Sequence, residues 1–121
     1  MDLQAFHQKV QHFAREEREE FLKNAPEHLR ETLENIPMKV LMGDENTGLY
    51  GDYSGTPYPK ENPFSAYSFP SDITLYTCGF IPYFEHHDEP GLRKKISKVI
   101  AHEYGHYLGF SEEELRRRGV F

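Results

Sequence analysis

The chain has 121 residues, a length that fits one domain with one hydrophobic core. Hydrophobic residues make up 37% of the chain and charged residues 28%, which is too apolar for a disordered acidic chain and too polar for a membrane protein. The formal net charge of -6 has the wrong sign to attract nucleic-acid phosphates or anionic lipids, so we expect neither nucleic acid nor membrane as a partner.

The N-terminal residues give an expectation about location. They lack the basic start and apolar run of a secretory signal, and no stretch reaches the roughly 18 consecutive apolar residues of a membrane-spanning helix. A cytoplasmic location is therefore expected. Cys78 is the only cysteine, which excludes an intramolecular disulfide and a multi-cysteine zinc site. We interpret Cys78 as a small buried strand residue.

The first part of the chain is predicted to form two helices. Its apolar residues recur at three- and four-residue spacing, as in Leu3, Phe6, Val10 and Phe13. This spacing predicts an amphipathic helix over residues 2–23, with its apolar stripe in the core. Pro26 opens a second short helix that runs to about Asn35.

Strands and a long loop are predicted for the middle of the chain. Residues 38–42 are short and apolar, which is typical of a buried strand. Glycine and proline dominate residues 43–71, which predicts a loop with a strand piece near residues 48–53. A loop of this length is either a plain connector or a lid at a substrate rim. Residues 73–81 are rich in β-formers and predict the best strand of the chain, closed by Pro82.

A helix predicted from Pro90 onwards carries a motif with metal-binding chemistry. His102 and His106 lie one turn apart on the same side of this helix, and Glu103 projects near the middle of its apolar stripe. This is the HExxH pattern, in which the two imidazoles bind zinc and the glutamate faces the water to be activated. One such match is expected in roughly 5% of shuffled chains of this composition. Requiring Gly109 and an acid three residues later lowers that chance below about one in a thousand.

The acid that follows this glycine is Glu112, which we predict to be the third zinc ligand. Gly109 can adopt the left-handed conformation that ends a helix, so that the chain turns back towards the metal. One alternative stays open. Ser111 is typical of an N-cap and Glu114 would complete a capping box, in which case Glu112 is only a first-turn acid favoured by the helix dipole.

Other residues also remain candidates for the third ligand. Only residues 107–121 follow the motif, so we expect the third ligand to be nearby, upstream or absent, rather than on a separate helix far downstream. Glu113 is the nearest alternative, and His86 and His87 are candidates upstream, although an exposed polar loop is the simpler interpretation of that segment. The remaining histidines, His7, His12 and His28, are expected at the surface of predicted helices.

The residues around the motif resemble a known family, the small bacterial zincin-like metallopeptidases. The resemblance rests on residues 102–112 (HEYGHYLGFSE), with weaker matches at Gly48–Gly51 and Asp72–Tyr76, and covers about residues 37–119. It implies an α+β fold, with a small mixed β-sheet packed against helices that include the HExxH helix. It also implies an HExxHxxGxx-acid metal site and largely undefined physiological substrates. Unlike metzincins, the chain has no methionine after the motif.

From this resemblance we expect a single zincin-like domain over residues 1–121. Its N-terminal helices would occupy residues 1–36, and the sheet and zinc-site helices residues 37–121.

The predicted activity is zinc-dependent hydrolysis of peptide bonds in a peptide or protein substrate. Two or three protein ligands leave zinc an open position for water, which zinc activates while Glu103 takes its proton as general base. The strand over residues 73–81, if it lies at a sheet edge, would align an extended peptide by backbone pairing.

Two alternatives come from other classes of protein. One is a zinc-binding regulatory domain without turnover. The other is a partner-binding helical module, which uses the long N-terminal helix and has an accidental HExxH. Zinc analysis of the purified protein separates the helical module from the other two hypotheses.

Overall fold

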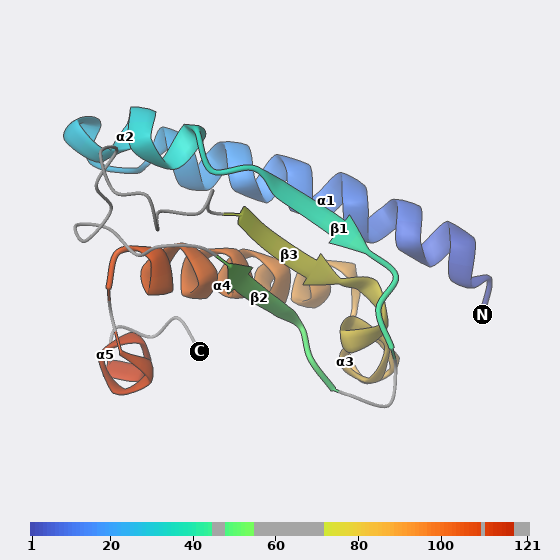
Figure 1. Cartoon of the computed structure of the whole chain (residues 1–121). Helices are drawn as coiled ribbons and strands as arrows, with labels where there is room; N and C mark the ends of the chain where they lie inside the picture. The colour runs from blue at the N-terminus through green and yellow to red at the C-terminus, as the bar shows by residue number, and fades with distance from the viewer. Residues whose placement is uncertain (45–47, 55–71, 110, 118–121) are drawn as a thin grey trace.

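The computed structural model describes residues 1–44, 48–54, 72–109 and 111–117, without the side chains of Glu112 and Leu115. The elements follow in the order α1 (Leu3–Lys23), α2 (Glu27–Glu34), β1 (Met38–Leu41), β2 (Gly51–Ser54), β3 (Asp72–Tyr76), a 3₁₀ helix η1 (Thr77–Phe80), α3 (Ile81–Glu85), α4 (Glu89–Tyr107) and α5 (Glu112–Arg117). Helices combined with one small mixed sheet confirm the predicted α+β class (Figure 1). Most of the loop predicted over residues 43–71, and with it the choice between lid and connector, lies outside the described residues.

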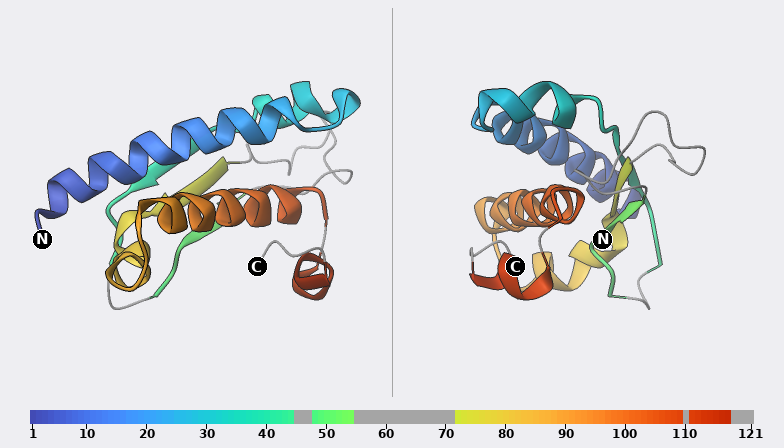
Figure 2. Two further views of the ribbon diagram at one scale, coloured as in Figure 1. Left: turned by 180° about the vertical axis from the view of Figure 1, so that it is seen from behind. Right: turned by 60° about the vertical axis from the view of Figure 1, so that its left-hand side comes forward.

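The sheet has three strands in the order β1-β3-β2. β1 runs parallel to the central strand β3, with Met38 opposite Ile73, and β2 runs antiparallel to it, with Gly51 opposite Leu75. Helices α1 and α4 lie side by side against one face of this sheet, α1 behind β1 and α4 behind β2 (Figures 1 and 2). The fold is therefore two layers deep where α4 carries the HExxH motif.

The core lies between these two layers. Side chains alternate along a strand, so one face of the sheet collects the apolar residues Met38, Val40, Ile73, Leu75 and Tyr53. The helices contribute their apolar stripes, including Phe6, Val10, Phe13, Leu92, Ile96 and Ile100. The amphipathic helix predicted for residues 2–23 is thus confirmed, together with the direction of its apolar face. Within the described residues, no helix combines the length and apolar character that a membrane crossing needs.

The strand predicted over residues 73–81 is too long. β3 ends at Tyr76, and the chain continues through η1 into α3. Pro82 does not close a strand but lies in the first turn of α3, where a missing N–H costs nothing because that group has no intrahelical partner. Cys78 is buried as predicted, but in η1 and not in a strand.

The position of β3 in the sheet also differs from the prediction. We considered this strand as a sheet edge that could pair with a peptide, but β1 and β2 pair with its two sides. A central strand has no backbone groups left for a further strand, so this role of residues 73–81 is excluded. One histidine expected at the surface is also placed differently. His7 is half-buried, with Nδ1 2.6 Å from Oγ1 of Thr77.

Candidate metal centre

Helix α4 is bounded by strong signals at both ends. The Asp88 carboxylate accepts a hydrogen bond from the backbone N–H of Gly91 at 2.9 Å and forms the N-cap. After Tyr107 the chain leaves the helix, and Gly109 has φ of +90°, a conformation that residues with a Cβ rarely adopt. Both the helix and the left-handed conformation that we predicted at Gly109 are confirmed, and the motif lies in the last turns of α4.

The two motif histidines face one another on the side of α4. Their Nε2 atoms lie 3.0 Å apart, and the ring planes cross at 86° with centroids 4.6 Å apart. Two nitrogens that bind one tetrahedral zinc ion at about 2.0–2.1 Å are separated by about 3.3 Å. The observed spacing of His102 and His106 is close to this value, and both side chains are only half-buried. The pair therefore fits a metal-binding role without rearrangement of the helix.

Glu103 lies on the neighbouring, buried side of the same turn. Only 6% of its surface is exposed, and it shares this face of α4 with Val99 and Ile100. A carboxylate gains nothing from apolar packing, because transfer of its charge from water costs free energy that the site must compensate. The prediction that Glu103 points into the apolar stripe is confirmed, and this placement is typical of an acid used in catalysis.

Tyr104, within the motif, anchors α4 to α1 and to the end of α2. The fully buried hydroxyl accepts a hydrogen bond from Nε of Arg18 at 2.8 Å and donates one to the carbonyl of Ile36 at 3.3 Å. Arg18 also donates to the carbonyls of Ile36 at 3.0 Å and Glu34 at 3.2 Å. The Tyr104 ring stacks on Phe21 with centroids 5.0 Å apart. Burial raises the pKa of Tyr104, and Arg18 opposes this shift.

Sequence reasoning missed this anchor. The amphipathic pattern of residues 2–23 indicates no partner for Arg18, and Tyr104 is one of the two unspecified positions of HExxH. The aromatic side chain beside Glu103 in an apolar stripe was a signal of burial, but the partner in α1 lies 86 residues away in the sequence. The contact depends on how α1 packs against α4, which no local pattern records.

The region of the predicted third ligand is described in part. Glu112 is the first residue of α5, and its side chain lies outside the described part of the chain. The capping box is confirmed, since the N–H of Ser111 donates to Oε1 of Glu114 at 3.3 Å and the N–H of Glu114 donates to Oγ of Ser111 at 3.2 Å. Glu113 is exposed. Among the described side chains, no three His, Cys, Asp or Glu residues form a metal-binding group, so ligation by Glu112 stays a prediction.

The upstream histidines lie at the opposite end of α4. They precede Glu89, the first residue of the helix, and about 20 Å of helix separates this residue from His102 at 1.5 Å per residue. His87 stacks on the Tyr83 ring with centroids 3.9 Å apart and is exposed. Neither His86 nor His87 reaches the histidine pair from there, so the exposed-loop interpretation of this segment is correct.

A groove runs along α4 where β2 packs against it. Its volume is about 220 Å³, and the residues that line it are Gly48, Leu49, Tyr50, Gly51, Lys95, Lys98, Val99 and His102. Gly51 permits the close approach, because a Cβ there would lie 2.8 Å from the Thr74 carbonyl oxygen and 3.4 Å from Cγ1 of Val99. In the described part of the sheet, β2 pairs only with β3 and is an edge strand. The groove therefore joins a strand edge to a motif histidine.

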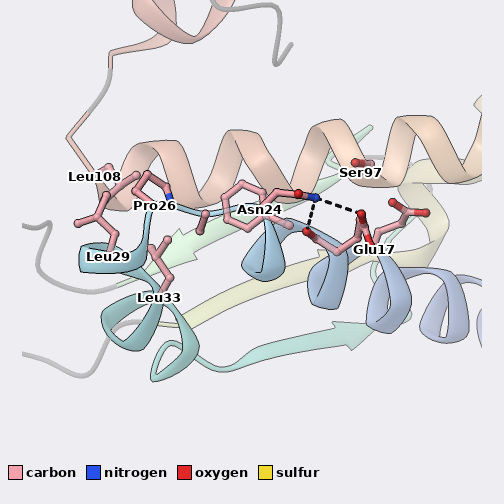
Figure 3. Close-up of a pocket in the computed structure, with 10 residues that line it drawn as sticks. Glu17, Asn24, Pro26, Leu29, Leu33, Ser97 and Leu108 are labelled. Carbon is pink, nitrogen blue, oxygen red and sulfur yellow. Dashed lines mark hydrogen bonds between the residues drawn. The ribbon is translucent and has the colours of Figure 1, made fainter.

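A second hollow lies between α1, α2 and the C-terminal end of α4 (Figure 3). Its volume is about 380 Å³, and Leu29, Leu33 and Leu108 form an apolar part of its wall. On its rim, the Asn24 amide donates hydrogen bonds to the backbone carbonyl and the carboxylate of Glu20. None of the described residues that line it is a histidine. Of these two hollows, the smaller groove is the one that a motif histidine, His102, lines.

The comparison with known families agrees with the chemistry of this site. A family model described as zincin-like metallopeptidase matches residues 27–120, from the start of α2 to beyond α5. The match includes the whole sheet, the groove and the motif helix. None of the curated proteins matches the chain.

Proposed function

Because the chain belongs to the zincin-like metallopeptidase family, we propose that it is a zinc-dependent peptidase with His102 and His106 as zinc ligands and Glu103 as general base. The observation that carries this proposal is the 3.0 Å separation of the two Nε2 atoms beside a buried carboxylate on the same helical turn. Glu112 is proposed as the third ligand, since Gly109, three residues before it, has the left-handed conformation that commonly ends a helix and allows the chain to turn.

Zinc held by these residues would polarise the scissile carbonyl as a Lewis acid and lower the pKa of water to about 7. The rest of the chemistry belongs to the chain. Glu103 accepts the proton of the attacking water as the bond to the carbonyl carbon forms, and then delivers that proton to the leaving amine. The burial of Glu103 keeps bulk water from competing for this proton.

The substrate is proposed to be a peptide in extended conformation. Among the described strands, β2 is an edge strand beside α4, and main-chain hydrogen bonds to such an edge align a peptide regardless of its sequence. This takes over the role that we first considered for residues 73–81. A peptide paired with β2 passes over the groove that His102 lines, which brings its backbone towards the motif.

The proposal is tested by metal analysis and one isosteric substitution. We expect near-stoichiometric zinc in protein purified without chelators or affinity-tag metals, and loss of this zinc in His102→Ala. Glu103→Gln should keep zinc but lose hydrolysis of every peptide that the parent cleaves, because glutamine preserves the shape and removes the base. Absence of zinc binding after zinc addition and dialysis would overturn the proposal. Bound zinc without cleavage across a diverse peptide library would favour the regulatory domain instead.

A further inference from the structure

Two lysines of α4 point into the groove beside the proposed metal site. Lys95 and Lys98 line it together with His102, and both are half-buried. The Lys95 ammonium lies 4.6 Å from the centroid of the Tyr50 ring and 5.8 Å from that of Tyr83. Cation–π contacts of this kind hold the ammonium in place, although they supply no negative charge.

These lysines have no acidic partner in the described structure. None of the ion pairs within 4.0 Å among the described residues includes Lys95 or Lys98. Burial lowers the pKa of Lys95, and the positive charge of Lys98 adds to this effect. The two cations therefore repel one another, and an anion between them would be stabilised by both.

Their positions along α4 relate them to the proposed site of cleavage. Lys98 precedes His102 by one turn, about 6 Å of helix, and Lys95 precedes it by about 10.5 Å. An extended peptide rises about 3.3 Å per residue. A peptide lying along the groove would thus place the side chains two and three residues from the cleaved bond beside these ammonium groups.

We propose that Lys95 and Lys98 form a subsite for an acidic side chain of the substrate, two or three residues from the scissile bond. This proposal rests on the proposed function, because it takes the groove as the path of a peptide. The ligand is a carboxylate on a peptide rather than a nucleic-acid phosphate, because the net charge of -6 would repel a polyanion while a single acidic residue meets only the local field of the two lysines. The subsite would select among peptides that β2 aligns without regard to sequence.

Binding and cleavage are measured separately, so that failure of the subsite and failure of the peptidase can be told apart. Zinc-loaded Glu103→Gln is titrated by fluorescence anisotropy with labelled peptides that differ only by Glu or Gln at one position. A parallel experiment measures cleavage of the same peptides by the parent. We expect the Glu peptide to bind about tenfold more tightly than the Gln peptide at low salt, because a hydrogen bond to a charged group is stronger than a neutral one by an amount equivalent to about that factor in affinity. This preference should shrink in high salt.

Lysine variants in the same background decide the assignment. Lys95→Gln combined with Lys98→Gln should abolish the preference for the Glu peptide, and replacement of both by Glu should reverse it in favour of a Lys peptide. Lys94→Gln is the matched control, because Lys94 is an exposed lysine of the same helix that does not line the groove. Thermal unfolding checks that each variant is folded.

Three results would overturn the subsite. They are an unchanged Glu preference in the double Gln variant, an equal loss in the Lys94→Gln control, and tighter binding of a single-stranded RNA oligonucleotide than of the acidic peptide. A lysine-dependent preference without cleavage by the parent would support the subsite and refute the peptidase.

Discussion

The contact between Arg18 and Tyr104 can be tested by a double-mutant cycle. Tyr104→Phe removes a fully buried hydroxyl that accepts from Arg18 at 2.8 Å and donates to Ile36 at 3.3 Å. Arg18→Met keeps much of the apolar stem and removes the guanidinium that also reaches the carbonyls of Ile36 and Glu34. The two substitutions share one hydrogen bond, but each also removes bonds that the other leaves intact.

The magnitudes follow from these contacts. A hydrogen bond to a charged group contributes about 1.5–3 kcal/mol and a neutral one about 0.5–1.5 kcal/mol. We expect Arg18→Met to lower the free energy of unfolding by about 2–4 kcal/mol, since its loss deprives three acceptors of a charged donor. Tyr104→Phe should cost about 1–2 kcal/mol, because Arg18 still serves the Ile36 carbonyl. The double variant should lose about 1–2 kcal/mol less than the sum of the two.

Urea unfolding of the four proteins measures this coupling. The slope of the unfolding free energy against urea should stay constant across the set, which shows that only stability has changed. Zinc affinity of folded Tyr104→Phe should change by less than about tenfold, because the hydroxyl anchors the helix and does not hold the metal. Additive losses within about 0.5 kcal/mol would refute the idea that the two side chains act as one anchor.

Three further predictions concern the metal site and its supports. Glu112→Gln should weaken zinc binding well beyond 10- to 100-fold while Glu113→Gln leaves it nearly unchanged, and the reverse result in a zinc titration would make Glu113 the ligand. Gly51→Ala should lower the free energy of unfolding in urea by about 1–3 kcal/mol, because the added Cβ would lie 2.8 Å from the Thr74 carbonyl oxygen. A variant as stable as the parent would show instead that β2 can shift to make room for the methyl group. Burial raises the pKa of Tyr104 in the folded state above its ordinary value of about 10. The contribution of the Tyr104 hydroxyl to stability is therefore fully present below about pH 10 and is lost as the pH rises through the higher, folded-state pKa. The difference in unfolding free energy between parent and Tyr104→Phe should therefore vary with pH only above about pH 10, and a constant difference up to pH 11 would contradict this.

The helices were predictable because their signals are local. The helix predicted over residues 2–23 is observed over Leu3–Lys23, since apolar spacing and capping depend only on residues a few positions apart. The prediction of a strand over residues 73–81 wrongly included η1, because Thr77, Cys78 and Phe80 have side chains that favour β-structure. In the structure the chain turns at these residues and continues into α3. Strand order was beyond reach, since the pairing of β3 with both neighbours depends on segments far apart in sequence.

The same distinction holds at the site. One-turn spacing was enough to place His102 and His106 on one side of a helix and Glu103 on its buried face. The groove depends on the docking of β2 on α4 through Gly51, and no local pattern in the sequence records that contact. The cationic character of the groove was hidden for the same reason, because Lys95 and Lys98 appear in the sequence as ordinary exposed residues of an amphipathic helix.

The residues of the HExxH motif lie on two different sides of α4. His102 is half-buried and lines the groove, while Glu103 and Tyr104 occupy the buried side of the same turn. A rotation of α4 that moved the histidines would also break the bonds of Tyr104 to Arg18 and Ile36. The position of the two motif histidines relative to β2 is therefore determined by contacts on the opposite side of the helix. For this reason, α1, which lies entirely before the matched residues 27–120, still contributes to the geometry of the site.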